Sequence, residues 1–147
     1  MLHLHYLCIV TDQSAYIREK GLKATPARLR VIEVLGDSHL AYSHAELETI
    51  FSDMDRVTLY RVLNDFEEAG LVHKIIDMES VTRFALCKHD CPDSQHTEGH
   101  VHFNCSKCHK MFCMEKVQSP LVKIPAGFKA ISTNTIVYGE CKDCRAA

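Results

Sequence analysis

The sequence lacks any uninterrupted apolar run of the roughly 18 residues that a membrane-spanning helix needs. The first ten residues contain His3 and His5 and have no basic start or small-residue cleavage site, which argues against a secretory signal peptide. No nucleophile–base pair or phosphate-binding loop is recognisable, so an enzyme is not expected. We therefore expect a cytoplasmic protein with no membrane partner and no small-molecule substrate.

The chain also lacks an excess of positive charge, because its formal net charge is −2. That total gives no support to nucleic-acid binding. Basic side chains are nevertheless concentrated near the start, with a single acid among them, at Arg18, Lys20, Lys23, Arg28 and Arg30. A local patch of this kind is enough to contact phosphates.

Cysteine and histidine, by contrast, are abundant, with eight and ten copies in 147 residues. Two Cys-x-x-Cys pairs, Cys105 with Cys108 and Cys141 with Cys144, favour metal binding over disulfides in a chain with no export signal. His100 and His102 stand two residues apart in a strand-like segment and should project from one face. The pattern predicts two metal sites. A thiol redox protein that cycles its Cys-x-x-Cys pairs is the alternative from another class.

The first half of the chain predicts three short helices followed by a β-hairpin. Thr25 and Pro26 are typical of a helix start, and Ser43 with Glu46 has the form of a capping box. The second of these helices should bury Leu47, Ile50 and Phe51. The third should begin after Asp53 or Asp55 and bury four apolar residues at helical spacing, Leu59, Val62, Leu63 and Phe66.

Two strands, 71–76 and 81–86, should complete a winged helix-turn-helix, whose third helix enters the major groove of DNA. Several side chains on the exposed face of that helix can bond to bases or phosphates, namely Arg56, Thr58, Tyr60, Arg61 and Asn64. Lys23 and Arg28 are expected on the DNA backbone. The alternative is an ordinary solvated helix face.

The expected organisation is α+β, with a winged helix over 1–86 that includes a loose arm over 1–12. A linker over 87–99 follows, and a metal-binding domain over 100–147. The linker is rich in possible ligands, at Cys87, His89, Cys91 and His96. Further strands are expected near 111–113 and from Phe128 to Tyr138.

Three stretches together resemble one family: residues 21–28, residues 58–63, and the His-x-His-x-x-Cys-x-x-Cys run over 100–108. The chain resembles the ferric-uptake-regulator family of metal-dependent bacterial repressors over roughly residues 20–144. The resemblance implies a homodimer, a small α/β dimerisation domain, and operator DNA as the partner. It also implies repression of metal-uptake or stress genes when the sensed metal is bound.

By family position, Cys105, Cys108, Cys141 and Cys144 look like a structural zinc site. Four thiolates are also a closed set that suits Zn²⁺ independently of the resemblance. His109, after the second cysteine, replaces the glycine usual in the family.

The regulatory site resembles that of zinc-uptake regulators, which implies His73, Cys87, His100 and His102 as ligands. Cys113, His89 and His96 are possible additions. Iron and peroxide sensors resemble one another in a sensory site with a histidine and a carboxylate, and this chain has Ala41 and Ala85 at those places. Iron sensors also have an auxiliary site with an acid and a histidine, where this chain has Pro120 and Thr133. A thiolate with imidazoles suits Zn²⁺ better than Fe²⁺.

The expected function is a metal-dependent repressor of metal uptake genes, zinc before iron, in which the regulatory metal joins wing, linker and dimerisation strand. An iron-responsive repressor is the alternative within the family.

Overall fold

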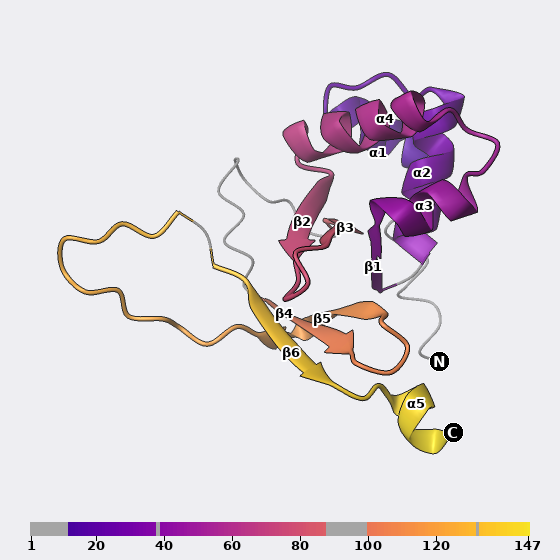
Figure 1. The fold of residues 1–147 in the computed structure, drawn as a ribbon. Coiled ribbons are helices and arrows are strands. Elements are labelled where there is room, and N and C mark those ends of the chain that lie inside the picture. Colours follow the sequence, from indigo (N-terminus) through magenta and orange to yellow (C-terminus); the bar gives the residue numbers. More distant parts are fainter. Residues whose placement is uncertain (1–11, 38, 88–99, 132) are drawn as a thin grey trace, which may run out of the picture.

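The computed structural model describes residues 12–37, 39–87, 100–131 and 133–147. Most helices cluster at one end of the molecule, and strands with a short helix form the other end (Figure 1). The elements are α1 (Gln13–Glu19), α2 (Pro26–Asp37), β1 (Leu40–Ser43), α3 (His44–Ile50), α4 (Arg56–Glu68), β2 (Val72–Ile76), β3 (Thr82–Leu86), β4 (His100–Cys105), β5 (Met111–Gln118), β6 (Thr135–Gly139) and α5 (Lys142–Ala146). None of the helices in these ranges is long and apolar enough to cross a membrane.

Residues 12–87, the winged-helix half, have the three-helix and hairpin pattern expected from the sequence. Ser43 and Glu46 form both bonds of a capping box, and Asp55 is the N-cap of α4. Gly70, at φ +73°, ends α4 in the left-handed region that glycine adopts readily. The strands of the wing pair in register from Val72 opposite Leu86 to Ile76 opposite Thr82.

The main apolar cluster of this half includes all four residues expected to be buried on α4. Leu47 and Phe51 also belong to it, but the expectation for Ile50 is wrong, because 44% of Ile50 is exposed. Ile50 lies at the last position of α3, on the wall of a cavity of about 280 Å³ beside β1 and β5. Helix α1 packs on α2 and was not expected from the sequence.

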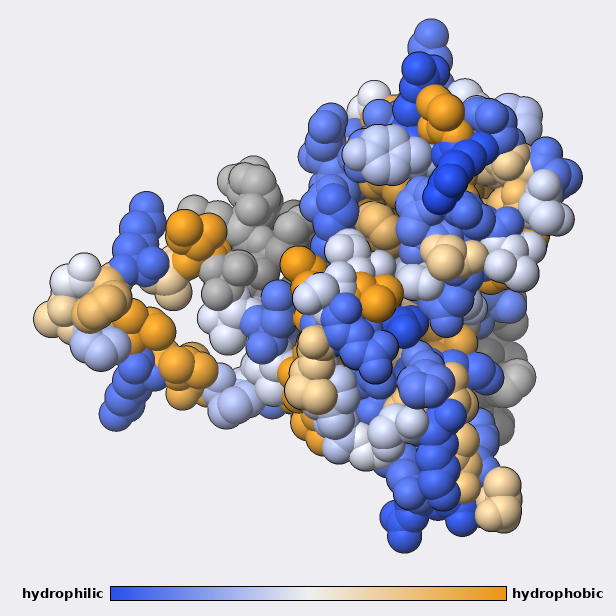
Figure 2. Space-filling model, viewed as in Figure 1, coloured by the Kyte–Doolittle hydropathy of each residue, from blue (hydrophilic) through white to orange (hydrophobic). Residues whose placement is uncertain are grey.

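Residues 100–147, the C-terminal half, contain β4 between antiparallel β5 and parallel β6. The last strand begins at Thr135 rather than near Phe128. The segment between β5 and β6 extends away from the body and carries exposed apolar side chains (Figures 1 and 2), including Leu121, Val122, Phe128 and Ile131. The two halves are not separate sheets, because β1 connects them into one sheet of order β2-β3-β1-β5-β4-β6.

Candidate metal centres and nucleic-acid interface

The four cysteines expected to form a zinc site come together at the end of the C-terminal half. Cys105 ends β4, Cys108 follows in the turn, and Cys141 and Cys144 flank the start of α5, with all four sulfurs within 4.8 Å of one another. Cys108 Sγ and Cys141 Sγ are 3.8 Å apart. A tetrahedron of Zn–S bonds of about 2.3 Å has edges of about 3.8 Å, so the separation fits a zinc ion.

Backbone amides favour the thiolate form in this cluster, which is the form that binds a cation. The amides of Cys108 and then Cys141 lower the pKa of the Cys105 thiol to about 6, and the amide of Cys141 lies 3.3 Å from Cys105 Sγ. Hydrogen bonding with Cys141 raises the pKa of Cys144, since the clustered sulfurs resist a further negative charge. A divalent cation would remove this conflict by favouring all four thiolates.

His109 takes the tight turn that follows the second cysteine. Its φ is +59°, in the left-handed region where glycine is favoured, and its amide donates to the carbonyl of Cys105 at 2.8 Å. This geometry explains why glycine suits the position, and histidine is among the residues that tolerate it better than most. Nothing else in the structure explains the substitution.

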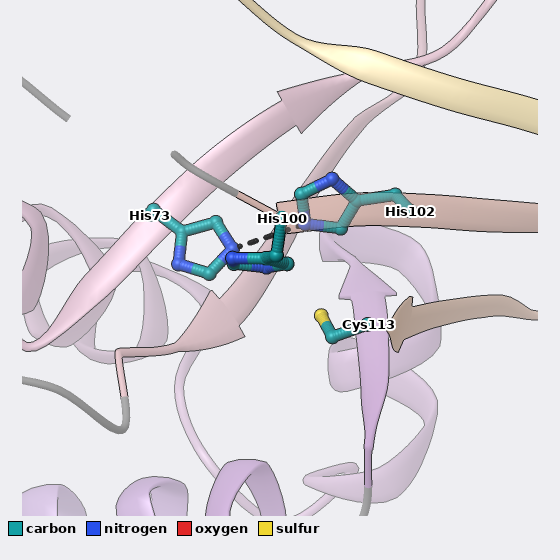
Figure 3. A group of neighbouring side chains, drawn as sticks. All are labelled: His73, His100, His102 and Cys113. Atoms are coloured by element: carbon teal, nitrogen blue, oxygen red, sulfur yellow. Dashed lines mark hydrogen bonds between the residues drawn. The ribbon is translucent and has the colours of Figure 1, made fainter. Parts of the chain in front are cut away.

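A second group of donors lies between the two halves (Figure 3): His73 from β2, His100 and His102 from β4, and Cys113 from β5. One donor atom from each lies within 4.8 Å of the others. Strand alternation places His100 and His102 on one face, with ring centroids 4.6 Å apart, as the sequence predicts. The register of β4 with β5 sets Cys113 directly opposite His102.

The distances in this group also suit a small cation. His73 Nε2 and His102 Nε2 are 3.3 Å apart, which is about the edge of a tetrahedron with Zn–N bonds of 2.0–2.1 Å. His102 is fully buried, and desolvation, followed by the charge of His100, lowers its pKa to about 4. The ring of His102 is therefore neutral at pH 7, the form that binds a metal.

Cys87 lies beside this group rather than in it. Its sulfur is 3.4 Å from Nδ1 of His73, on the opposite side of the ring from Nε2. The structure therefore brings together His73, His100 and His102 with the additional candidate Cys113, and places Cys87 behind His73. The other candidates of the linker, His89, Cys91 and His96, lie outside the described residues.

The expected DNA-binding side chains are spread over α4 and the start of α2. Arg56, Tyr60 and Arg61 are exposed on α4, and Thr58 is half-buried near its N-terminus. Figure 2 shows mostly hydrophilic side chains over this helical end of the molecule. Lys23 is exposed before α2.

Two of the basic residues expected to contact DNA have partners within the chain. Arg28 donates to Asp65 of α4 at 2.5 Å and to the carbonyl of Lys23 at 2.8 Å, with 17% of its side chain exposed. Arg56 stays 79% exposed, and its Nε donates to Glu48 at 2.8 Å. Nδ1 of His44 also lies 2.8 Å from the same carboxylate oxygen of Glu48, so His44 and Arg56 share one partner.

The chain combines a winged helix with two candidate metal sites, one of four cysteines and one of three histidines and a cysteine. This combination defines a metal-dependent transcription regulator. The sequence model described as the ferric uptake regulator family matches residues 19–138, and the chain belongs to that family. As expected from the sequence, it is therefore a regulator and not an enzyme.

A curated relative agrees with this membership, and solved structures share the fold. The ferric uptake regulation protein of Yersinia pestis is 30% identical, over 92% of this chain and 94% of its own length. The Vibrio cholerae ferric uptake regulator structure has a TM-score of 0.58 at 24% identity, covering 88% of this chain and all of that one. A zinc uptake regulator in complex with zinc and DNA has a TM-score of 0.59 at 21% identity, covering 90% and 89%.

Proposed function

We propose that this chain is a zinc-responsive repressor of zinc-uptake genes that binds its DNA operator as a homodimer. The observation that carries the proposal is the donor group between the halves. It consists of three imidazoles and one thiol from three strands, with no carboxylate among the described residues of the group. Nitrogen and sulfur donors gathered this closely suit Zn²⁺, whereas carboxylates favour harder cations.

In this proposal His73, His100, His102 and Cys113 are the regulatory ligands. Cys87 orients His73, because a hydrogen bond between its sulfur and Nδ1 leaves Nε2 to face the site. The four cysteines at the end of β4 and the start of α5 hold a structural zinc ion. Zinc supplies binding energy at both sites, and only the regulatory ion is exchanged when the cell's zinc supply changes.

The regulatory ligands belong to both halves, so they can share one ion only when β2 of the wing lies against β4 and β5. The dimer would then hold its two α4 helices at the spacing of successive major grooves. Tyr60, Arg61 and Arg56 would contact bases or phosphates, with Thr58 near the groove and Lys23 on the DNA backbone. We assign Arg28 to fixing the start of α2 against Asp65 rather than to DNA.

The alternative is an iron-responsive repressor, favoured by the ferric uptake regulation proteins among the sequence relatives. The absence of an oxygen donor from the described regulatory group argues for zinc instead. A hundredfold effect on DNA affinity requires about 2.7 kcal/mol of preference for the DNA-binding arrangement.

The test begins with zinc content, which should be two ions per chain, one of them removable by a chelator. DNA duplexes are then selected from a random pool by the zinc-loaded protein and titrated under graded free Zn²⁺ or anaerobic Fe²⁺. Zinc should tighten binding about a hundredfold, with a smaller effect of iron. The proposal is wrong if the protein binds the selected duplex equally well after its exchangeable metal is removed. A larger effect of Fe²⁺ would instead support the iron-responsive alternative.

A further inference from the structure

Strand β1 was not expected from the sequence, and it divides its pairing between the two halves. Its first two residues, Leu40 and Ala41, pair with Phe112 and Met111 of β5. Its last two residues pair with β3 of the wing, Tyr42 opposite Phe84 and Ser43 opposite Arg83. A strand of four residues therefore connects the sheet of the wing to the sheet of the C-terminal half (Figure 1).

The residue before β1 also forms a backbone hydrogen bond with Cys113, one of the proposed ligands. The amide of Cys113 donates to the carbonyl of His39, immediately before β1, at 2.7 Å. His39 Nδ1 also lies 3.7 Å from a carboxylate oxygen of Glu115, two residues further along β5. Any shift of β1 away from β5 would break the hydrogen bond that helps to position Cys113.

The order of the strands places β1 between the proposed ligands. His73 lies on β2, two strands to one side of β1 in the sheet, while Cys113 and the two β4 histidines lie on the other side. The strands between them present small apolar side chains, Ala41 at 2% exposure and Ala85 at 1%. These alanines pack in one cluster with Ile75, Met111 and Cys113. The donors can therefore share an ion only when the sheet curves closely around β1.

The other end of β1 continues directly into the DNA-reading helices. Ser43 is both the last residue of β1 and the N-cap of α3. Its cap partner Glu46 also accepts from Arg83 of β3 at 3.0 Å. Helix α3 precedes α4, which carries the proposed DNA contacts. The position of β1 therefore affects where α3 and α4 lie.

We propose that β1 is the coupling strand of this regulator: metal occupancy of the His73, His100, His102 and Cys113 group controls the pairing of residues 39–41 with β5, and this pairing sets the position of α3 and α4 for DNA. The inference rests on the proposed function and identifies the element that is regulated. Metal binding and DNA binding stabilise the same β1–β5 pairing, and each therefore strengthens the other.

Hydrogen exchange of the full-length dimer, measured by mass spectrometry with and without Zn²⁺ in the regulatory site, tests the coupling directly. Residues 39–43 contain none of the proposed ligands. Their amides should exchange about tenfold or more slowly with zinc, which corresponds to about 1.4 kcal/mol of added pairing stability. The interior of α2, residues 28–35, serves as the internal reference and should not change. Equal exchange of 39–43 in both states would overturn the inference.

A matched pair of variants gives the second measurement. Ala41→Asp places a charge in the cluster between the halves, whereas Ala15→Asp makes the same change at an exposed site on α1. Ala41→Asp should raise the free Zn²⁺ needed for half-maximal DNA binding about tenfold or more, and Ala15→Asp should not. An unchanged requirement in a folded Ala41→Asp protein would also overturn the inference. If that variant does not fold, the wild-type exchange experiment decides.

The two proposals fail in different ways. If zinc does not tighten DNA binding at all, the proposed function is wrong. If zinc tightens DNA binding while the exchange of residues 39–43 is unchanged, the function stands and β1 is not the coupling strand.

Discussion

The sharpest prediction concerns two cysteines, one within the proposed regulatory site and one beside it. Cys113 Sγ is within 4.8 Å of the donor atoms of all three histidines, whereas Cys87 Sγ contacts His73 Nδ1 at 3.4 Å. Cys113→Ser should therefore remove a metal ligand. Cys87→Ser should only weaken the orientation of one ligand.

The two losses should differ in size. Four-ligand structural zinc sites bind with about 10–16 kcal/mol, or roughly 2.5–4 kcal/mol per ligand, so loss of Cys113 should weaken zinc binding about 10²–10³-fold. Residues that hold a ligand in place typically contribute about 10–100-fold. Because serine keeps a hydrogen-bonding group near His73, Cys87→Ser should lie at the low end of that range.

The expected losses of zinc affinity for the two variants approach each other, so cobalt is used to distinguish a ligand from a residue that orients one. The structural site is first filled with zinc, and Co²⁺ is then added to the exchangeable site. A cobalt–thiolate charge-transfer band should appear in the wild type and in Cys87→Ser, and should be absent from Cys113→Ser. Loss of the band in Cys87→Ser with its retention in Cys113→Ser would refute the reasoning and make Cys87 the ligand.

Three further predictions follow from single features. Cys141→Ser should remove one zinc ion per chain and unfold the C-terminal half, since metal binding energy is folding energy there; a dimer with full zinc content by mass spectrometry would contradict this. Ser43→Ala should lower the free energy of unfolding in urea by about 1 kcal/mol through loss of the capping box, whereas Ser52→Ala, at an exposed site, should not. The third prediction applies to protein freed of exchangeable metal. Burial, followed by the charge of His100, lowers the pKa of His102 from 6.5 to about 4. The unfolded chain therefore binds a proton at this histidine at higher pH than the folded chain does. The free energy of unfolding should therefore fall between pH 6.5 and 4, by at most about 3 kcal/mol, and the His102→Asn variant should lose that part of the slope in urea titrations at each pH.

Local patterns predicted the parts of the fold that depend on neighbours in sequence. The capping box at Ser43 and the buried stripe of α4 are set by residues three and four apart, and both are present. The shared face of His100 and His102 follows from strand alternation alone. These features need no knowledge of distant partners.

Features that depend on pairing between distant segments could not be predicted in the same way. Strand β1 has four residues, too few for a periodic pattern, and it is stabilised by β3 and β5, which lie far along the chain. The place of Cys113 depends on the register that sets it opposite His102. The direction of Cys87 likewise depends on the packing of β2, which the spacing of the residues does not reveal.

Ala41 and Ala85 bear on both the proposed choice of metal and the proposed coupling between the halves. They stand where the resemblance to iron and peroxide sensors leads one to expect a histidine and a carboxylate, and here both are buried in the apolar cluster that contains Cys113. A polar ligand left unpaired in that cluster would cost about 1–3 kcal/mol. The small side chains therefore do two things at once: they remove a potential oxygen donor, and they let β1 and β3 pass closely between the strands that carry the remaining donors. In the proposed function, a preference for zinc and the close packing of β1 would then have the same structural cause.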